Sequence, residues 1–333
     1  MKNTNFSSYF LILPAAAALL TACGGSRGQA LGVPALQTVA NPAARVQTSG
    51  ADLLYIAREG VEGKARRGVI SILSFPGGTE VAKISHIDAL GMCSDSSGNV
   101  WAIAYVSGAF ELLEYAHGGT TPIAKIAMPK RSFARGCAVD PASGDLAVAN
   151  ELSLNPYSGR IDVWAGARSG SPAVYKAPFV PEYVTYDDKG NICAAGYLGG
   201  SDPWLVLGEL PKGARRVERL KLDKPVGVPG SIAWDGTHVA VATGGFDLKG
   251  APRIYRVNIS GTTGKVTGET VPRDPPMYDQ PIFSLVGESV VSLAGFAGDR
   301  VDVWPYPKSG KRTQYIGLFR RIKAMTISPG QAP

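Results

Sequence analysis

Residues 95–105 of the chain read DSSGNVWAIAY, an Asp-x-x-Gly turn that runs directly into an alternating apolar strand. Nearly the same pattern returns as DPASGDLAVAN at 140–150, DDKGNICAAGY at 187–197 and WDGTHVAVATG at 234–244. Self-similarity at a period of about 40 to 50 residues is typical of repeat architectures such as the β-propeller. The spacing of these four stretches therefore decides the expected fold.

A second kind of hairpin lies between consecutive copies of this pattern. Examples are RIDVWAGARSGSPAVY at 160–175 and WLVLGELPKGARRVERL at 204–220. Both kinds alternate apolar and polar residues and turn through glycine, which indicates antiparallel strands. Four such strands in each repeat of about 45 residues form the blade of a β-propeller. The 41 glycines and 24 prolines suit a turn-rich all-β chain.

The number of strands predicts how the ring closes. Residues 89–316 supply five complete four-stranded blades. The C-terminal strand IKAMTIS at 322–328 is left over, together with three strands between residues 51 and 85. We expect these four to form a sixth blade, because joining both ends of the chain removes exposed strand edges. The sequence thus predicts a six-bladed all-β propeller over residues 51–328, with 329–333 as a tail.

The repeated turns have a structural role in this interpretation. We expect each Asp to cap the turn between the first two strands of its blade and each Gly to take the positive φ. Trp164 and Trp304 occupy matching third-strand positions and are expected to pack in the core.

The stretches CSDSSGNVWAIAY at 93–105 and VTYDDKGNICAAGY at 184–197 resemble blades of NHL-repeat and SMP-30-like (TolB-like) propellers. The resemblance covers most of 51–328 and implies a six-bladed fold, which proteins of unrelated function share. SMP-30-like lactonases hold a divalent metal through Glu, Asn and Asp from different blades. Those three residues cannot be mapped onto this sequence. A metal-dependent lactonase-like hydrolase is therefore kept as the alternative to a binding protein. We predict no catalytic residue, metal ligand or cofactor.

The N-terminal residues 1–22 have the pattern of a signal peptide, with an apolar run that ends at Leu20. The stretch Leu20-Thr21-Ala22-Cys23 resembles the lipobox of bacterial lipoproteins, which implies cleavage before Cys23 and acylation of its thiol. The alternative is an ordinary cleaved signal peptide that contains a cysteine. Residues 23–49 are rich in Gly, Ala, Ser, Gln and Pro, as in a flexible tether. We therefore expect a protein anchored by lipid in the bacterial cell envelope, at the outer membrane or periplasmic side of a Gram-negative cell.

Three further cysteines, Cys93, Cys137 and Cys193, lie within apolar strand patterns. Inert buried thiols are the default expectation for such positions. Cys93 and Cys137 occupy equivalent places in neighbouring repeats, so a disulfide between them is the alternative.

Sequence motifs for catalysis are sparse. His86 and Asp88 form the one candidate acid–base pair on the expected binding face, because His117 and His238 belong to turns of the opposite face. Aromatic residues are more numerous there and could stack on a sugar or anchor a protein partner. They are Tyr105, Phe133, Tyr157, Phe179, Tyr183, Tyr197, Trp204, Phe246, Tyr278 and Phe296.

Charge divides the expected binding face, which is formed by the loops between second and third strands and by those between blades. Around the sixth and first blades these loops hold ten basic and three acidic residues, whereas the remaining loops hold three basic and eight acidic. The predicted partner-binding residues of the basic sector are Arg58, Arg66, Arg67, Lys130, Arg131, Arg135, Arg320 and Arg321. We expect the basic sector to bind an acidic envelope protein or an anionic glycan or lipid component, and no nucleic acid. The alternative is a merely solvated mixture of charges.

Overall fold

The computed structural model describes residues 50–62, 65–130, 132–152, 158–199, 202–244, 251–278, 281–295, 298–319 and 321–330. Within these ranges the regular structure is β-strand, apart from one short 3-10 helix, Ala165–Ala167. This part of the chain contains no helix with the length and apolar character needed to cross a membrane.

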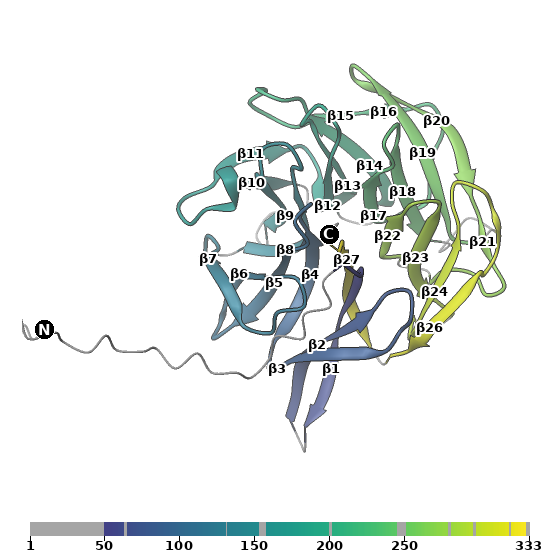
Figure 1. Cartoon of the computed structure of the whole chain (residues 1–333). Coiled ribbons are helices and arrows are strands. Elements are labelled where there is room, and N and C mark those ends of the chain that lie inside the picture. The colour runs from purple at the N-terminus through teal and green to yellow at the C-terminus, as the bar shows by residue number, and fades with distance from the viewer. Residues whose placement is uncertain are drawn as a thin grey trace, which may run out of the picture. The chain divides into compact units, whose positions relative to one another are not determined.

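Six four-stranded antiparallel units surround a central axis, which confirms the predicted propeller (Figure 1). The first complete blade comprises β4 (Asp88–Ser94), β5 (Val100–Val106), β6 (Ala109–Tyr115) and β7 (Pro122–Ala127). The second comprises β8 (Ser132–Val139), β9 (Leu146–Leu152), β10 (Gly159–Trp164) and β11 (Ala173–Ala177). The third comprises β12 (Val180–Tyr186), β13 (Ile192–Gly199), β14 (Asp202–Leu210) and β15 (Glu218–Arg219).

The fourth and fifth blades carry small additions at their outer edges. The fourth comprises β17 (Val228–Trp234), β18 (Val239–Gly244), β19 (Arg253–Ser260) and β20 (Thr263–Thr270), with the short β16 (Lys221–Leu222) parallel to β20. The fifth comprises β22 (Phe283–Val286), β23 (Ser289–Ala294), β24 (Arg300–Pro305) and β26 (Gln314–Leu318). A parallel pair, β21 (Pro272–Arg273) and β25 (Gly310–Lys311), joins the segments outside these two blades.

The sixth blade is built from both ends of the chain, as the strand count predicts. Its strand order is β27 (Ile322–Ser328), β1 (Leu53–Glu62), β2 (Ala65–Ser74) and β3 (Glu80–Ser85). We call it the composite blade. β27 is its innermost strand and pairs antiparallel with β1, with Leu53 opposite Ser328. The β1–β2 hairpin runs beyond the neighbouring strands in Figure 1.

The repeated turns behave as the sequence predicts. The Oδ1 atom of Asp187 accepts backbone N–H groups from Lys189 at 2.9 Å and Asn191 at 2.8 Å. Gly190 between them has a φ of 80°, in the left-handed region that favours glycine. Asp95, Asp140 and Asp235 accept equivalent backbone bonds in their own turns. These aspartates therefore stabilise the link between the innermost and second strands of each blade.

The core lies between neighbouring blades, where large side chains from facing sheets meet. Trp101, Trp164 and Trp304 are among the largest fully buried side chains. Each of the two third-strand tryptophans also donates its indole N–H to a carbonyl, Trp164 to Gly170 at 3.1 Å and Trp304 to Arg273 at 3.1 Å. The predicted packing role of Trp164 and Trp304 is confirmed.

The expectation of three inert thiols is wrong for two of the cysteines. Cys93 on β4 and Cys137 on β8 form a disulfide with a Cα–Cα distance of 5.6 Å. The two cysteines lie on adjacent innermost strands, where Cys93 follows Gly91 by two residues and Cys137 follows Gly136 by one. This near-match in the repeat brings their Cα atoms within bridging range. Cys193 is free and buried, as expected, and burial raises the pKa of its thiol well above the ordinary value.

Candidate functional site

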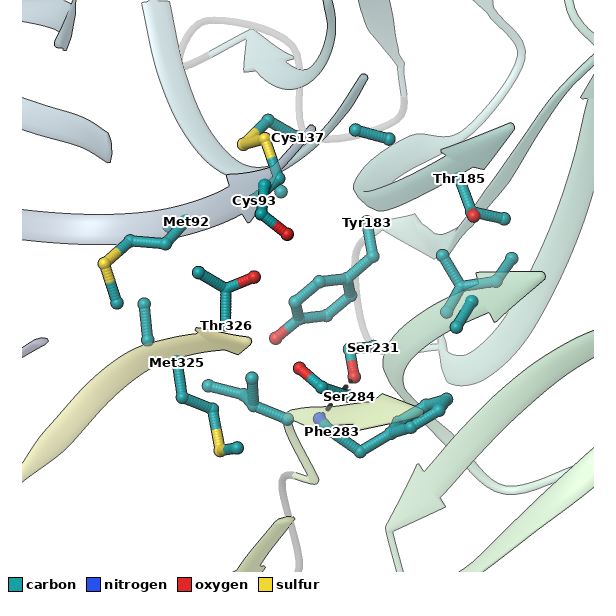
Figure 2. A pocket seen from close by; sticks show the side chains of 18 of the residues that line it. Met92, Cys93, Cys137, Tyr183, Thr185, Ser231, Phe283, Ser284, Met325 and Thr326 are labelled. Atoms are coloured by element: carbon teal, nitrogen blue, oxygen red, sulfur yellow. Dashed lines mark hydrogen bonds between the residues drawn. A yellow bond between two sulfur atoms is a disulfide. The ribbon is translucent and has the colours of Figure 1, made fainter. Parts of the chain in front are cut away.

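The innermost strands of the blades enclose a central channel with a volume of about 780 Å³ (Figure 2). Each of these strands begins at one face of the propeller, which we call the loop face, and ends at the repeated Asp turns of the opposite face. Phe133, Arg135 and Lys323 line the channel at the loop face, whereas Asp52 and Pro329 line it at the opposite face. The channel therefore runs along the propeller from one face to the other.

A β-bulge near the loop face interrupts several innermost strands. The pairing register shifts between Ala134 and Gly136 on β8, which leaves Arg135 as the extra residue. Equivalent shifts leave Glu182 extra on β12 and Lys323 extra on β27. A bulge redirects the side chain of the extra residue relative to the regular alternation. The fold thus repeatedly places a charged side chain at the channel mouth.

These charged side chains are joined in ion pairs. Lys323 Nζ lies 2.6 Å from Asp88 Oδ1, which links the composite blade to the first blade. Arg135 Nε lies 3.8 Å from Glu182 Oε1, which links the second blade to the third. Arg135 belongs to the predicted basic sector and Glu182 to the acidic loops. One residue from each predicted sector therefore contributes to this ion pair.

The other predicted basic residues have different surroundings. Arg321 Nη1 lies 2.6 Å from Glu59 Oε2, and Arg58 Nε donates to the Ser71 hydroxyl at 3.3 Å. Lys130 is exposed. The side chains of four more predicted residues lie outside the described part of the chain: Arg66, Arg67, Arg131 and Arg320. The basic sector as a whole stays a prediction.

A row of aromatic rings extends from this mouth across two blades. The rings of Tyr105 and Phe110 meet edge to face at a centroid distance of 5.2 Å, and those of Phe110 and Phe133 at 5.8 Å. The Arg135 guanidinium lies over Phe133, 5.4 Å from the ring centroid. Tyr105 is 49% exposed, so the row offers an open aromatic surface. The sequence singled out Tyr105 and Phe133 but missed Phe110, which the tight Ser107–Gly108 turn brings back beside Tyr105.

Two glutamates, Glu182 and Glu151, add negative charge near Arg135. Burial raises the pKa of Glu182, the Arg135 charge opposes this shift, and the Glu151 carboxylate adds to it. Tyr197 donates its hydroxyl to Glu151 Oε1 at 3.4 Å. Burial, together with the charges of both glutamates, raises the pKa of Tyr197 to about 12. The mouth thus combines aromatic faces, a guanidinium and carboxylates, a set suited to recognition.

The remaining aromatic candidates lie in the core, in the channel or at the surface. Trp204 is 40% exposed, whereas Tyr278 lines the channel. Phe179 is fully buried in the core between blades, whereas Tyr183 reaches into the channel (Figure 2). Tyr157, Phe246 and Phe296 lie outside the described residues.

The histidines occupy different faces. His86 lies in an exposed turn with a φ of 63°, and the neighbouring Asp88 carboxylate is bound by Lys323. His117 and His238 lie in turns at the opposite face, where His117 contacts Ser328 and His238 lies 3.7 Å from Asp235. Among the described residues, no group of three or more His, Cys, Asp or Glu side chains is placed to hold a metal ion. The metal-dependent alternative therefore gains no ligand set from this part of the chain.

Comparison with known proteins identifies the fold. No family model matches the chain, and no curated protein matches its sequence. A solved protein of unknown function from Bacteroides caccae superimposes with a TM-score of 0.59 and 12% identity, covering 84% of this chain and 99% of that one. The nidogen/laminin complex matches with a TM-score of 0.57 and 15% identity (84% and 100% covered). TolB from Acinetobacter baumannii matches with a TM-score of 0.56 and 15% identity (84% and 67% covered). At these identities the likeness shows the fold alone, a six-bladed β-propeller like that of TolB.

Proposed function

We propose that this protein is a lipid-anchored binding protein of the bacterial cell envelope, whose propeller holds an anionic partner on its loop face. The observation that carries the proposal is the channel mouth, where contacts run from Tyr105 through Phe110 and Phe133 to Arg135. Aromatic residues and arginine are enriched at the energetic centres of protein interfaces. The sequence KARRG at 64–68 adds Lys64, Arg66 and Arg67 to the predicted basic sector.

Two features support a location outside the cytoplasm. The N-terminal 22 residues have the pattern of a signal peptide, and the lipobox cysteine, Cys23, follows it directly. The Cys93–Cys137 disulfide fits an oxidising compartment, because cytosolic proteins rarely keep such bonds. Signal, anchor and disulfide all agree with the cell envelope.

The direction of the chain supports the loop face as the binding face. β1 begins at Leu53 on the opposite face, close to His117 and Ser328, and runs toward the loop face. The chain that precedes Leu53 therefore joins the propeller on the face away from the mouth. The attachment point of the predicted tether is thus not at the channel mouth.

The nature of the partner follows from charge. The chain carries a net charge of +7 with a calculated pI near 9.2. An acidic envelope protein or an anionic glycan or lipid component would be attracted to the basic sector, and this attraction would be screened by salt. The nidogen/laminin structure is itself a complex, which accords with a propeller that binds a protein.

The proposal is tested by fractionation and capture. Wild-type protein should sediment with membranes and retain an envelope component at low salt, which is released as salt rises. The Cys23→Ser variant should become soluble or stay uncleaved, because it lacks the acylated thiol. A variant that stays in the membrane fraction in processed form would contradict the anchor. Capture that does not change between low and high salt would contradict an anionic partner.

A further inference from the structure

The central channel has the size of a small-molecule site. Its volume of about 780 Å³ lies within the range of roughly 300 to 1,000 Å³ that is usual for ligand pockets. It is lined by the innermost strands, which are held by the blades behind them. The cavity is thus formed by rigid parts of the fold.

The lining is neutral along the middle of the channel. The charged side chains among the lining residues are Asp52, Arg135 and Lys323, and all three lie at the ends. Each already has a partner: Asp52 Oδ1 accepts the backbone N–H of Gly330 at 2.8 Å, while Arg135 and Lys323 form the ion pairs described above. A charged ligand inside the channel would lose water without gaining a free counter-charge, which is costly.

The middle of the channel combines hydroxyl groups with apolar surface. Figure 2 shows Tyr183, Ser231, Ser284 and Thr326 around one stretch of it. Partly buried apolar residues, among them Leu90 and Ile282, also line the channel. Hydroxyl groups can both donate and accept hydrogen bonds. Such a lining suits a molecule with an apolar body and a few neutral polar groups.

Tyr183 is the residue that departs most from the repeat. The position after the bulge is glycine in the first two blades, Gly91 and Gly136. A Cβ atom at Gly91 would lie 2.0 Å from the carbonyl oxygen of Arg135, so those blades leave no room for a side chain there. In the third blade the same position holds Tyr183, whose ring extends into the channel (Figure 2). Burial raises the pKa of its phenol, so the hydroxyl stays a hydrogen-bond donor at neutral pH.

We infer that the channel binds an uncharged small molecule with an apolar body and hydroxyl or carbonyl groups, and that Tyr183 donates a hydrogen bond to it. This ligand is distinct from the anionic partner proposed for the loop face. The inference rests on the channel alone and does not depend on the anchor or on the basic sector.

The test uses the neutral fluorescent dye Nile red as a probe of the channel. Wild-type protein should bind the dye saturably. Ser284→Trp should lower the affinity about tenfold or more, because the indole occupies the space where the dye buries its apolar surface. Ser169→Trp in an exposed turn is the matched control for an added indole and should bind as wild type.

A competition series on the wild-type chain tests the neutrality of the site, and it remains decisive if Ser284→Trp does not fold. We expect 1-octanol to displace the dye, and octanoate and octylammonium to compete about tenfold less well or worse, because their charges must be desolvated. Tyr183→Phe should weaken competition by octanol about threefold to tenfold, the factor that one hydrogen bond contributes. Absent saturable dye binding, equal displacement by octanoate, or unchanged affinity in a folded Ser284→Trp variant would each overturn the inference.

Discussion

The imidazole Nδ1 of His117 lies 2.6 Å from the hydroxyl oxygen of Ser328, the last residue of β27. Its Nε2 lies 3.1 Å from the carbonyl oxygen of Ala51, just before β1. A single side chain from the first complete blade therefore contacts both segments that close the ring, the start of β1 and the end of β27. Ser94 of the same blade adds a hydrogen bond to the Ile327 carbonyl at 2.6 Å. These contacts secure the closure of the ring from the neighbouring blade.

The first prediction concerns this contact. His117→Ala and Ser328→Ala should each lower the free energy of unfolding by about 1 kcal/mol, the usual contribution of a hydrogen bond. The double variant should lose less than the sum of the two, because both single changes remove the same interaction. Urea denaturation of the four proteins measures the coupling. Strictly additive losses would mean that the two side chains do not depend on each other.

The second prediction concerns ring closure itself. Deleting the chain from Ile322 onward removes β27, whose residues Ala324 to Ser328 are all buried. The loss should exceed the roughly 5 to 15 kcal/mol of net stability that a domain possesses, so cooperative folding should fail. Deleting only residues 331–333 is the control and should leave thermal unfolding unchanged. Calorimetry that finds a wild-type transition in the longer deletion would contradict closure by β27.

The third prediction concerns the disulfide between the first and second blades. With Cys23 replaced by Ser, the denatured but unreduced chain should contain one reactive thiol, that of Cys193, and reduction should expose three. The Cys93→Ser/Cys137→Ser variant should lose about 2 to 5 kcal/mol of stability, as is usual when a native disulfide is removed. Thiol titration and urea denaturation measure the two effects. Three reactive thiols before reduction would disprove the bridge.

The fourth prediction concerns Glu182 at the channel mouth. Burial raises its pKa above 4.5, so the folded state binds this proton more tightly than the unfolded state does. Its contribution to stability is full below pH 4.5 and is lost as the pH rises through the folded pKa. Glu182→Gln lacks this loss, so its stability relative to wild type should increase as the pH rises toward neutrality. Urea denaturation across this pH range measures the free energy of unfolding of each protein. The difference between Glu182→Gln and wild type should grow with pH, whereas the control Glu218→Gln on the opposite face should differ from wild type by a constant amount. A constant difference for Glu182→Gln would contradict the prediction.

The fold was predictable because its signals are local and repeated. An Asp that binds backbone N–H groups and a Gly with positive φ need only a few consecutive residues, and four copies set the period. The disulfide was not decided by sequence, because an apolar strand accommodates a buried thiol and a half-cystine equally well. The positions of Arg135 and Glu182 were assigned to the correct face. Their pairing depends on β-bulges, which simple alternation does not reveal.

The most direct test of the proposed function is a charge reversal in the predicted basic sector. Arg66→Glu, Arg67→Glu and Arg131→Glu in one variant should abolish low-salt capture of envelope components and leave the melting temperature nearly unchanged. The matched control reverses three exposed residues on the opposite face, Lys212, Arg215 and Arg216, and changes the net charge equally. We predict that the control captures the same components as wild type. Equal capture by the basic-sector variant and by wild type would contradict the account.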